Sequence, residues 1–211
     1  MEIYSTEEQQ EEAIKKAVKD NWLVVLIGAA IGLGGVYGWR YYDATKIAEQ
    51  EAASDAYRVV FEQAGKDGED VLAQSKQYIA EHDNKSYTVM MALLAAKEAV
   101  KNKDLDEAAS QLGWAADNTS EASLKAVVLV RLARIQTEQQ KYDDALTTLN
   151  QSVPESFVAK AEELKGDIYL RQGDKNKART AYLLASEKGG TEGNNGLQLK
   201  IDDLTEAGPA S

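Results

Sequence analysis

Hydrophobic residues are spread very unevenly along this chain, and one uninterrupted apolar run lies near its start. Residues 22–39 read WLVVLIGAAIGLGGVYGW and contain no charged side chain and no side-chain amide. A helix of that length is about 27 Å long, close to the thickness of the hydrocarbon core of a bilayer. Aromatic residues stand at both ends, where the two membrane–water interfaces would lie. The pattern predicts a single transmembrane helix over residues 22–42, with the lipid bilayer as its surroundings.

Two other structures give similar apolar runs, namely the core helix of a soluble protein and a cleavable signal peptide. The five glycines of the run would weaken a helix in water, whereas membrane helices tolerate glycine. A signal peptide has a shorter apolar region followed by small residues, but here the bulky, charged sequence RYYD follows at residues 40–43. The sequence therefore favours an anchor that is retained.

Basic residues flank the run unequally and predict its orientation. Lys15, Lys16 and Lys19 precede the run, and Arg40 and Lys46 follow it. The excess on the N-terminal side predicts that residues 1–21 form a short cytoplasmic tail. The large C-terminal part would then lie outside the cytoplasm, which in a bacterium is the periplasm.

The glycines of the run also have the spacing of a helix-packing surface. Gly28, Gly32 and Gly35 share one helical face, and Gly34 with Gly38 forms a second pair of small residues four apart. Small residues let another helix approach closely, so these five are candidate contacts with a second membrane helix. A glycine-rich anchor without any partner would show the same spacing, and both interpretations stay open.

Beyond residue 43 the periodicity is helical and recurs at the length of a helical hairpin. Alternating β-branched residues are scarce, while Ala, Glu, Lys, Gln and Leu are abundant. Residues 164–185 read LKGDIYLRQGDKNKARTAYLLA, and six of them have tetratricopeptide-repeat spacing: Gly166, Tyr169, Gly173, Ala178, Tyr182 and Ala185. Small residues at two of these positions would let the paired helices touch, and the tyrosines would fill the space around that contact.

The same pattern recurs in two upstream segments. It appears 33 residues earlier in RLARIQTEQQKYDDALTTL and another 37 residues earlier in LLAAKEAVKNKDLDEAASQLGWAA. The longer step predicts a longer connection at residues 117–123. A weaker unit is expected from about Tyr57 to Ala80. A generic helical bundle is the alternative, but three units in register favour an all-α solenoid in which neighbouring hairpins bury each other's apolar faces.

The C-terminal region predicts a capping helix. Leu197, Leu199, Ile201 and Leu204 recur at helical spacing, and a glycine-rich loop over residues 189–196 precedes them. The expected organisation is a tail at 1–21, an anchor at 22–42, a periplasmic repeat domain at 43–205 and a frayed end at 206–211.

The concave side of such a stack is its expected binding surface, because the first helix of each hairpin lines it. The repeat register places ten residues there: Met90, Leu93, Lys97, Val100, Val127, Val130, Arg134, Glu163, Asp167 and Arg171. This mixture of apolar and charged residues suits a protein or an unfolded segment better than a small metabolite. The sequence indicates no cluster of lysine and arginine that would capture a carboxylate or a phosphate. A register error of one residue would move a side chain from this surface into the core.

Composition narrows the possible functions further. The chain has 24 Lys and Arg against 35 Asp and Glu, a net charge of −11, which argues against a nucleic-acid binder. It has no cysteine and a single histidine, His82, so thiolate metal sites and cysteine nucleophiles are excluded and histidine-based sites are disfavoured. Phosphate-loop, dinucleotide, zinc-protease and serine-hydrolase motifs are missing. We therefore expect a non-enzymatic protein without a metal or a cofactor.

Anchor and repeats together resemble a known family. The opening MEIY, the segment EAIKKAVKDN, a glycine-rich span closed by GWRYY, and then RLARIQ and LKGDIYL follow one another in the chain. In this order they resemble the YfgM-type ancillary subunits of the bacterial Sec translocon, over nearly the whole chain. The resemblance implies an inner-membrane protein with a periplasmic tetratricopeptide domain. It also implies association with the SecYEG channel and with a membrane-anchored chaperone of the PpiD type, and it implies no catalytic residues.

Two functions follow as hypotheses. In the first, the chain is an adaptor that its span holds beside the translocon. Its groove binds a PpiD-like periplasmic chaperone or an emerging secretory chain, and the adaptor thereby assists the passage and folding of secretory and outer-membrane proteins. In the second, it is a repeat scaffold for envelope-assembly or division proteins. An enzyme, a third class, would need an acid–base site that the sequence does not show.

Overall fold

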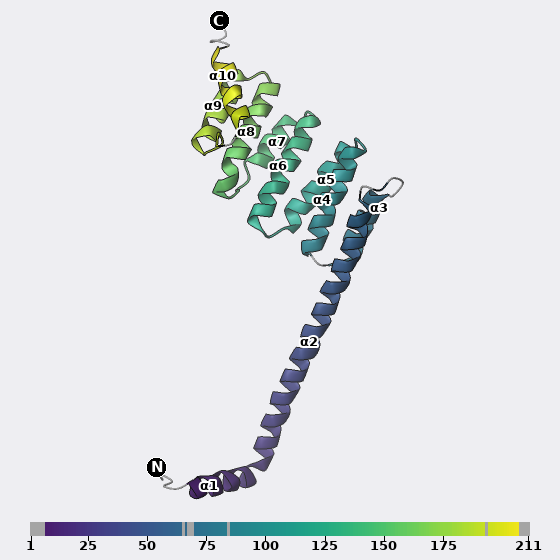
Figure 1. Cartoon of the computed structure of the whole chain (residues 1–211), viewed down its shortest axis with the longest axis vertical. Helices are drawn as coiled ribbons and strands as arrows, with labels where there is room; N and C mark the ends of the chain where they lie inside the picture. The colour runs from purple at the N-terminus through teal and green to yellow at the C-terminus, as the bar shows by residue number, and fades with distance from the viewer. Residues whose placement is uncertain (1–6, 65, 67–69, 84, 193, 207–211) are drawn as a thin grey trace. The chain divides into compact units, whose positions relative to one another are not determined.

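The structure is a computed structural model that describes residues 7–64, 66, 70–83, 85–192 and 194–206, and within these ranges it contains helices and turns but no strand. The helices are α1 (Glu7–Asp20), α2 (Trp22–Gln63), α3 (Val71–Glu81), α4 (Lys85–Lys101), α5 (Leu105–Asn118), α6 (Ala122–Glu138), α7 (Tyr142–Leu149), α8 (Glu155–Arg171), α9 (Lys175–Glu187) and α10 (Asn195–Glu206). The all-α fold predicted from the sequence is confirmed (Figure 1). Of the end predicted to fray, residues 207–211 lie outside the described part.

The chain divides into two compact units, Met1–Ala52 and Ala53–Ser211. Helix α2 contributes residues to both units, since it begins at Trp22 and continues to Gln63 instead of ending near residue 42. The reason is local: residues 43–63 contain neither glycine nor proline and are rich in good helix formers.

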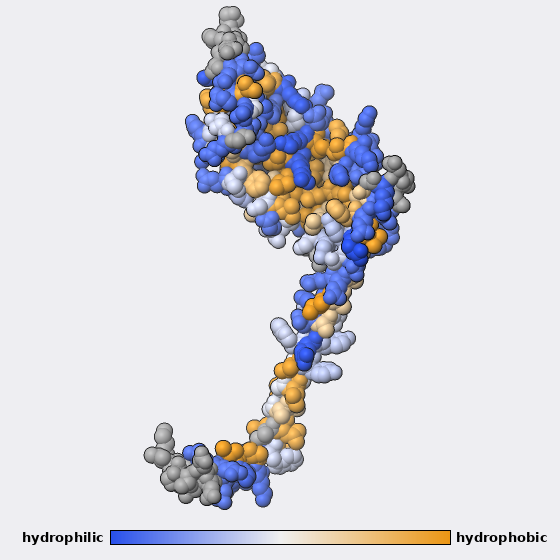
Figure 2. Space-filling view, in the orientation of Figure 1, coloured by the Kyte–Doolittle hydropathy of each residue, from blue (hydrophilic) through white to orange (hydrophobic). Residues whose placement is uncertain are grey.

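The first part of α2 has the surface of a membrane span. It is long and apolar enough to cross a bilayer, and none of its apolar window is buried inside the protein. Leu26, Ile31 and Leu33 are all more than half exposed. Hydrophobic residues cover this part of the helix in the space-filling view (Figure 2). Because water would make such exposure costly, this surface is suited to lipid.

The second unit is built of successive helical hairpins, α4–α5, α6–α7 and α8–α9, with the end of α2 and α3 before them and α10 after them (Figure 1). Buried clusters join each hairpin to the next. One cluster joins α4, α5 and α6, a second joins α6, α7 and α8, and a third joins α9 and α10. A fourth joins the end of α2 to α3 and α4. This continuous core is that of a helical solenoid, in which no hairpin could cover its apolar face alone.

The turn inside each hairpin confirms the repeat register. Lys103, Gln140 and Gly173 occupy equivalent turn positions and have positive φ angles of 62°, 61° and 83°. This conformation suits glycine, so two of the three turns carry a strained residue. Asp104 and Asp174 follow in two of these turns, and their carboxylates accept hydrogen bonds from the backbone of the next helix at 3.0 Å.

The last hairpin shows why the pattern needs a small residue in its first helix. A Cβ atom added to Gly166 would overlap the ring of Tyr182, which is fully buried. The hydroxyl of Tyr182 donates a hydrogen bond to Asp167 at 2.7 Å. Burial and this carboxylate both raise the pKa of Tyr182, so the phenol stays neutral. The ring is therefore fixed against the glycine.

The prediction of a longer connection at residues 117–123 is wrong. Helix α5 extends to Asn118 and α6 begins at Ala122, so only residues 119–121 connect them. The extra residues of this repeat lie in α5 itself, which has 14 residues against 8 in α7. Glu121 caps α6 by accepting hydrogen bonds from the backbone of Ser123 and Leu124. The second helix of a repeat can therefore lengthen without disturbing the stack.

The capping helix predicted at the C-terminus is present as α10. Leu197 and Ile201 are buried against α9, and Leu204 packs beside them. Leu199 points outward and is 63% exposed. Helix α10 thus covers the end of the core, as a terminal repeat element must.

Candidate protein-binding groove

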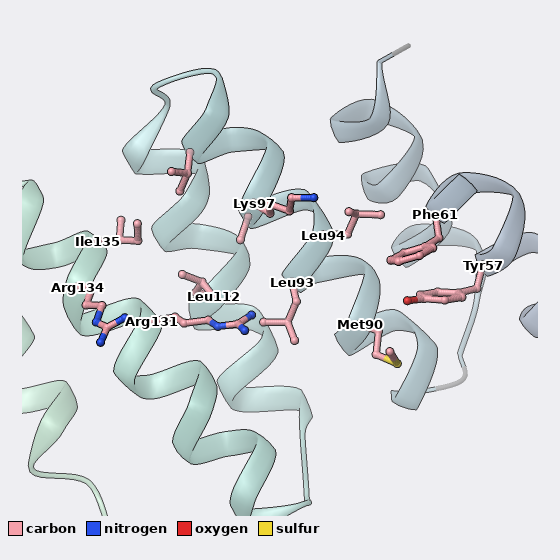
Figure 3. Close-up of a pocket in the computed structure, with 12 residues that line it drawn as sticks. Tyr57, Phe61, Met90, Leu93, Leu94, Lys97, Leu112, Arg131, Arg134 and Ile135 are labelled. Atoms are coloured by element: carbon pink, nitrogen blue, oxygen red, sulfur yellow. The ribbon is translucent and has the colours of Figure 1, made fainter. Parts of the chain in front are cut away.

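A groove of about 540 Å³ lies in the second unit (Figure 3). Its walls are α4, α6, the C-terminal end of α2 and one residue of α5. Twelve residues line it: Tyr57, Phe61, Met90, Leu93, Leu94, Ala96, Lys97, Val100, Leu112, Arg131, Arg134 and Ile135. All of them belong to the second compact unit.

Helical spacing explains why these residues meet. Leu93, Lys97 and Val100 stand at i, i+4 and i+7, so they share one face of α4. Other residues of α4, such as Met91 and Ala95, are fully buried and belong to its core-facing side. Leu94 and Ala96 belong to the buried clusters and also line the groove, so the groove face of α4 adjoins its core-facing side.

The floor of the groove is apolar and only partly covered. Phe61 is 54% exposed, Met90 45% and Val100 42%. The Tyr57 ring stacks on Phe61 with centroids 5.8 Å apart and contacts Tyr87 at 5.5 Å. Burial and the nearby Tyr87 raise the pKa of Tyr57, so its hydroxyl is a neutral donor. Large apolar side chains that gather in one exposed groove are typical of surfaces that bind other molecules.

Three cations stand around this floor. Lys97, Arg131 and Arg134 are exposed, and among the described residues none of them forms an ion pair. The sequence indicated no cluster of lysine and arginine, because Lys97 lies a whole repeat before the two arginines. The stack brings them together, since equivalent positions of successive first helices face the same groove.

The ten residues predicted for the groove fall into three groups. Met90, Leu93, Lys97, Val100 and Arg134 line it. Val127 is half-buried and lies outside it, and Val130 is buried in the core between α6 and α8. Glu163, Asp167 and Arg171 lie on α8, which does not line the groove.

The three residues of α8 make contacts between helices instead. Glu163 accepts a hydrogen bond from Lys200 of α10 at 2.9 Å and another from Lys160 of its own helix at 2.8 Å, and Asp167 accepts one from Lys200 at 2.7 Å. Burial favours the neutral acid, but the two lysines outweigh it and hold the pKa of Glu163 below its usual range.

Arg171 belongs to a second contact of this kind. Its guanidinium donates to Glu138 at 2.7 Å. These pairs join α8 to α10 and to α6, so they stabilise the stack.

The sequence reasoning missed seven lining residues: Tyr57, Phe61, Leu94, Ala96, Leu112, Arg131 and Ile135. A usable signal existed for the aromatic pair, because Tyr57 and Phe61 lie four residues apart at the start of the weakest repeat. Treating that repeat as a full hairpin would have placed its first helix beside α4.

The five candidate packing glycines remain available for a partner. A Cβ atom added to Gly28, Gly32, Gly34, Gly35 or Gly38 would have no neighbour within 4 Å. Their contact with another membrane helix remains a prediction.

The described residues contain no group of three His, Cys, Asp or Glu side chains able to hold a metal ion. His82 stacks on Tyr78 with ring centroids 4.0 Å apart, and its Nδ1 lies 3.0 Å from the Tyr78 carbonyl oxygen. This histidine packs at the end of α3, outside the groove.

Comparison with known proteins gives a consistent result. The family described as Tetratricopeptide repeat-like domain matches residues 15–206. A protein of Escherichia coli K12 named ancillary SecYEG translocon subunit is 32% identical over 206 residues, which cover 97% of this chain and 100% of that protein.

Relatives with the same name occur in other bacteria. That of Haemophilus influenzae is 30% identical over 95% of this chain and 99% of its own length, and that of Neisseria gonorrhoeae is 29% identical over 87% and 88%. No solved structure matches the chain significantly.

Proposed function

The chain belongs to the family of ancillary SecYEG translocon subunits, and on that basis we propose that it is itself a subunit associated with this channel in the bacterial inner membrane. The first part of α2 anchors it as a single span. The basic residues before the span favour a cytoplasmic N-terminus, which places the repeat domain in the periplasm. Reporter fusions on either side of the span test this orientation, and a cytoplasmic C-terminus would exclude it.

The repeat domain acts in this proposal as a non-enzymatic adaptor. Its groove binds a membrane-anchored periplasmic chaperone of the PpiD type, or a secretory chain that leaves the channel. The observation that carries the proposal is the apolar groove with exposed aromatic and aliphatic side chains, present on a chain that also has a membrane anchor. A protein segment is the occupant that such a groove fits best, because its side chains can fill the apolar floor while its backbone stays solvated.

Membrane anchoring makes weak groove contacts sufficient. Two proteins held in the same bilayer next to the same channel meet at a raised effective concentration. A groove of this modest size does not need nanomolar affinity to be occupied there. Release also remains fast, which suits a protein that hands a client from one partner to another.

Co-purification from membranes tests the proposal. Full-length protein with an affinity tag is extracted in mild detergent, and its partners are identified by mass spectrometry. We expect the channel subunits and a periplasmic chaperone to co-purify. A Leu93→Asp variant, which places a charge on the groove floor, should retain the channel and lose the chaperone. Recovery of neither partner with the unmodified chain would refute the proposal, and recovery of division or cell-wall proteins would favour the scaffold alternative.

A further inference from the structure

We propose that the groove selects an acidic amphipathic segment of its protein partner, in which apolar side chains are followed by carboxylates. This inference rests on the proposed protein-binding function of the groove and specifies the chemistry of the occupant. The arginines of α6 recognise the carboxylates, while the end of α2 and the start of α4 receive the apolar side chains.

The groove has two different ends (Figure 3). Tyr57, Phe61 and Met90 stand together at one end, with an aromatic stack and no charged side chain among them. Arg131 and Arg134 stand at the other end, on α6, and Leu93 lies between the two ends. A segment that lies along the groove therefore contacts apolar side chains at one end and positive charge at the other.

The two arginines are free to bind a ligand. Arg58 pairs with Asp55 and Arg171 pairs with Glu138, at 3.2 Å and 2.7 Å. Within the described part of the chain, Arg131 and Arg134 have no such carboxylate, although the protein carries 35 acidic residues. A guanidinium offers a planar set of donors that matches a carboxylate, so this is the complementary group.

The charge of the whole chain adds selectivity. The chain has a net charge of −11, so its overall field disfavours the approach of an acidic peptide. Lys97, Arg131 and Arg134 supply positive charge at the groove that no carboxylate of the described residues pairs with, so an acidic peptide is attracted there. A basic peptide would instead be repelled there and attracted elsewhere, so charge sets the preference while the apolar floor supplies the contact area.

Labelled peptides test the inference with full-length protein in nanodiscs of neutral lipid. The probes share one half of Leu, Phe and Ser residues and differ in the other half, which contains three Glu, three Gln or three Lys. Fluorescence anisotropy should show that the Glu peptide binds about tenfold more tightly than the Gln peptide, because each exposed ion pair contributes modestly. The difference should shrink as salt is added, since exposed charges are screened.

Charge reversal supplies the decisive variant. R131E/R134E should lose the preference for the Glu peptide and favour the Lys peptide, and R131K/R134K should keep the original preference. Both arginines are exposed, so these changes leave the core intact, and circular dichroism checks that they do. Arg179→Glu is the matched control, because Arg179 is an exposed arginine on α9 outside the groove, and it should leave the preference unchanged.

The outcomes separate this inference from the proposed function. Equal binding of the Glu and Gln peptides, a preference that survives charge reversal, or no binding of any peptide would overturn the inference. If all three peptides bind equally and Leu93→Asp abolishes that binding, the groove still binds protein and only the charge recognition is wrong. If the peptides behave as expected but no chaperone co-purifies, the proposed chaperone contact fails while the recognition chemistry stands.

Discussion

Replacing Gly166 with alanine tests the helix contact on which the last hairpin depends. The new Cβ atom would lie within 3.0 Å of three carbon atoms of the Tyr182 ring. That ring is fully buried and its hydroxyl is bonded to Asp167, so it cannot move aside freely. Overpacking of this kind costs about 1–3 kcal/mol, whereas alanine in a helix gains about 1 kcal/mol over glycine. The net expectation is a loss of up to about 2 kcal/mol.

The same substitution in a protein that lacks the Tyr182 ring tests whether this ring causes the loss of stability. In a Tyr182→Leu protein the ring is absent, so Gly166→Ala should become stabilising by about 0.5–1 kcal/mol through helix propensity alone. Gly113→Ala is the matched control, since a Cβ atom at Gly113 in α5 meets nothing within 4 Å and should stabilise by a similar amount.

Thermal unfolding of the full-length protein in detergent measures these differences by circular dichroism. Each 1 kcal/mol corresponds to about 2–4 °C for a domain of this size. If Gly166→Ala raises the midpoint equally in both backgrounds, the close helix contact does not exist.

Three further predictions concern the turns, the loss of stability at acidic pH and the membrane anchor. Gln140→Gly should raise the unfolding midpoint by the equivalent of about 0.5–1 kcal/mol, because Gln140 has a φ of 61°; an unchanged or lower midpoint would argue against the left-handed turn. The pKa of Glu163 is lowered, since hydrogen bonds from its lysine partners outweigh burial, so its stabilisation is present above the unfolded pKa of about 4.3 and is lost as the pH falls through the folded value. Stability should therefore fall less steeply in acid for Glu163→Gln than for the unmodified protein, and parallel pH curves would contradict this. Ile31→Arg places a charge near the middle of the span at a cost of about 2.5–3.5 kcal/mol, so alkaline extraction should release more of this variant than of the unmodified chain; equal retention would mean that Ile31 does not face the bilayer core.

The hairpins could be predicted from the sequence because their signal is periodic and local. Gly166, Ala178 and Tyr182 have fixed spacing within one repeat, and the close contact between α8 and α9 depends on these small and aromatic residues. The length of α5 could not be predicted in the same way. Its extra residues preserve the helical pattern up to Asn118, so a longer helix and a longer loop look alike in the sequence.

The groove was less predictable because it depends on the rotation of each helix about its own axis. On α4, Leu93 and Lys97 were placed by the register and lie along the groove. On α6, the predicted Val130 is buried and its neighbour Arg131 lines the groove instead. One residue corresponds to a rotation of about 100° around a helix, which is enough to exchange core for surface.

The residues of α8 that were predicted for the groove form ion pairs with residues far away in the sequence, and no local pattern reveals such pairs. Glu163 and Asp167 have the spacing of a groove face, but Lys200 of the capping helix approaches both of them. The partner lies more than thirty residues away in the chain, so only the folded stack shows that these carboxylates are occupied.

Site-specific photo-crosslinking in intact membranes tests the central claim most directly, namely that a membrane-anchored groove holds a protein partner next to the translocon. A photoreactive residue at Leu93 or Phe61 probes the groove, and one at Leu199, which is 63% exposed on α10, serves as the matched surface control. We expect the two groove positions to crosslink to a periplasmic chaperone or to a secretory chain, and the control position not to do so. Crosslinks that are equally frequent at all three positions, or absent from the groove, would contradict the account.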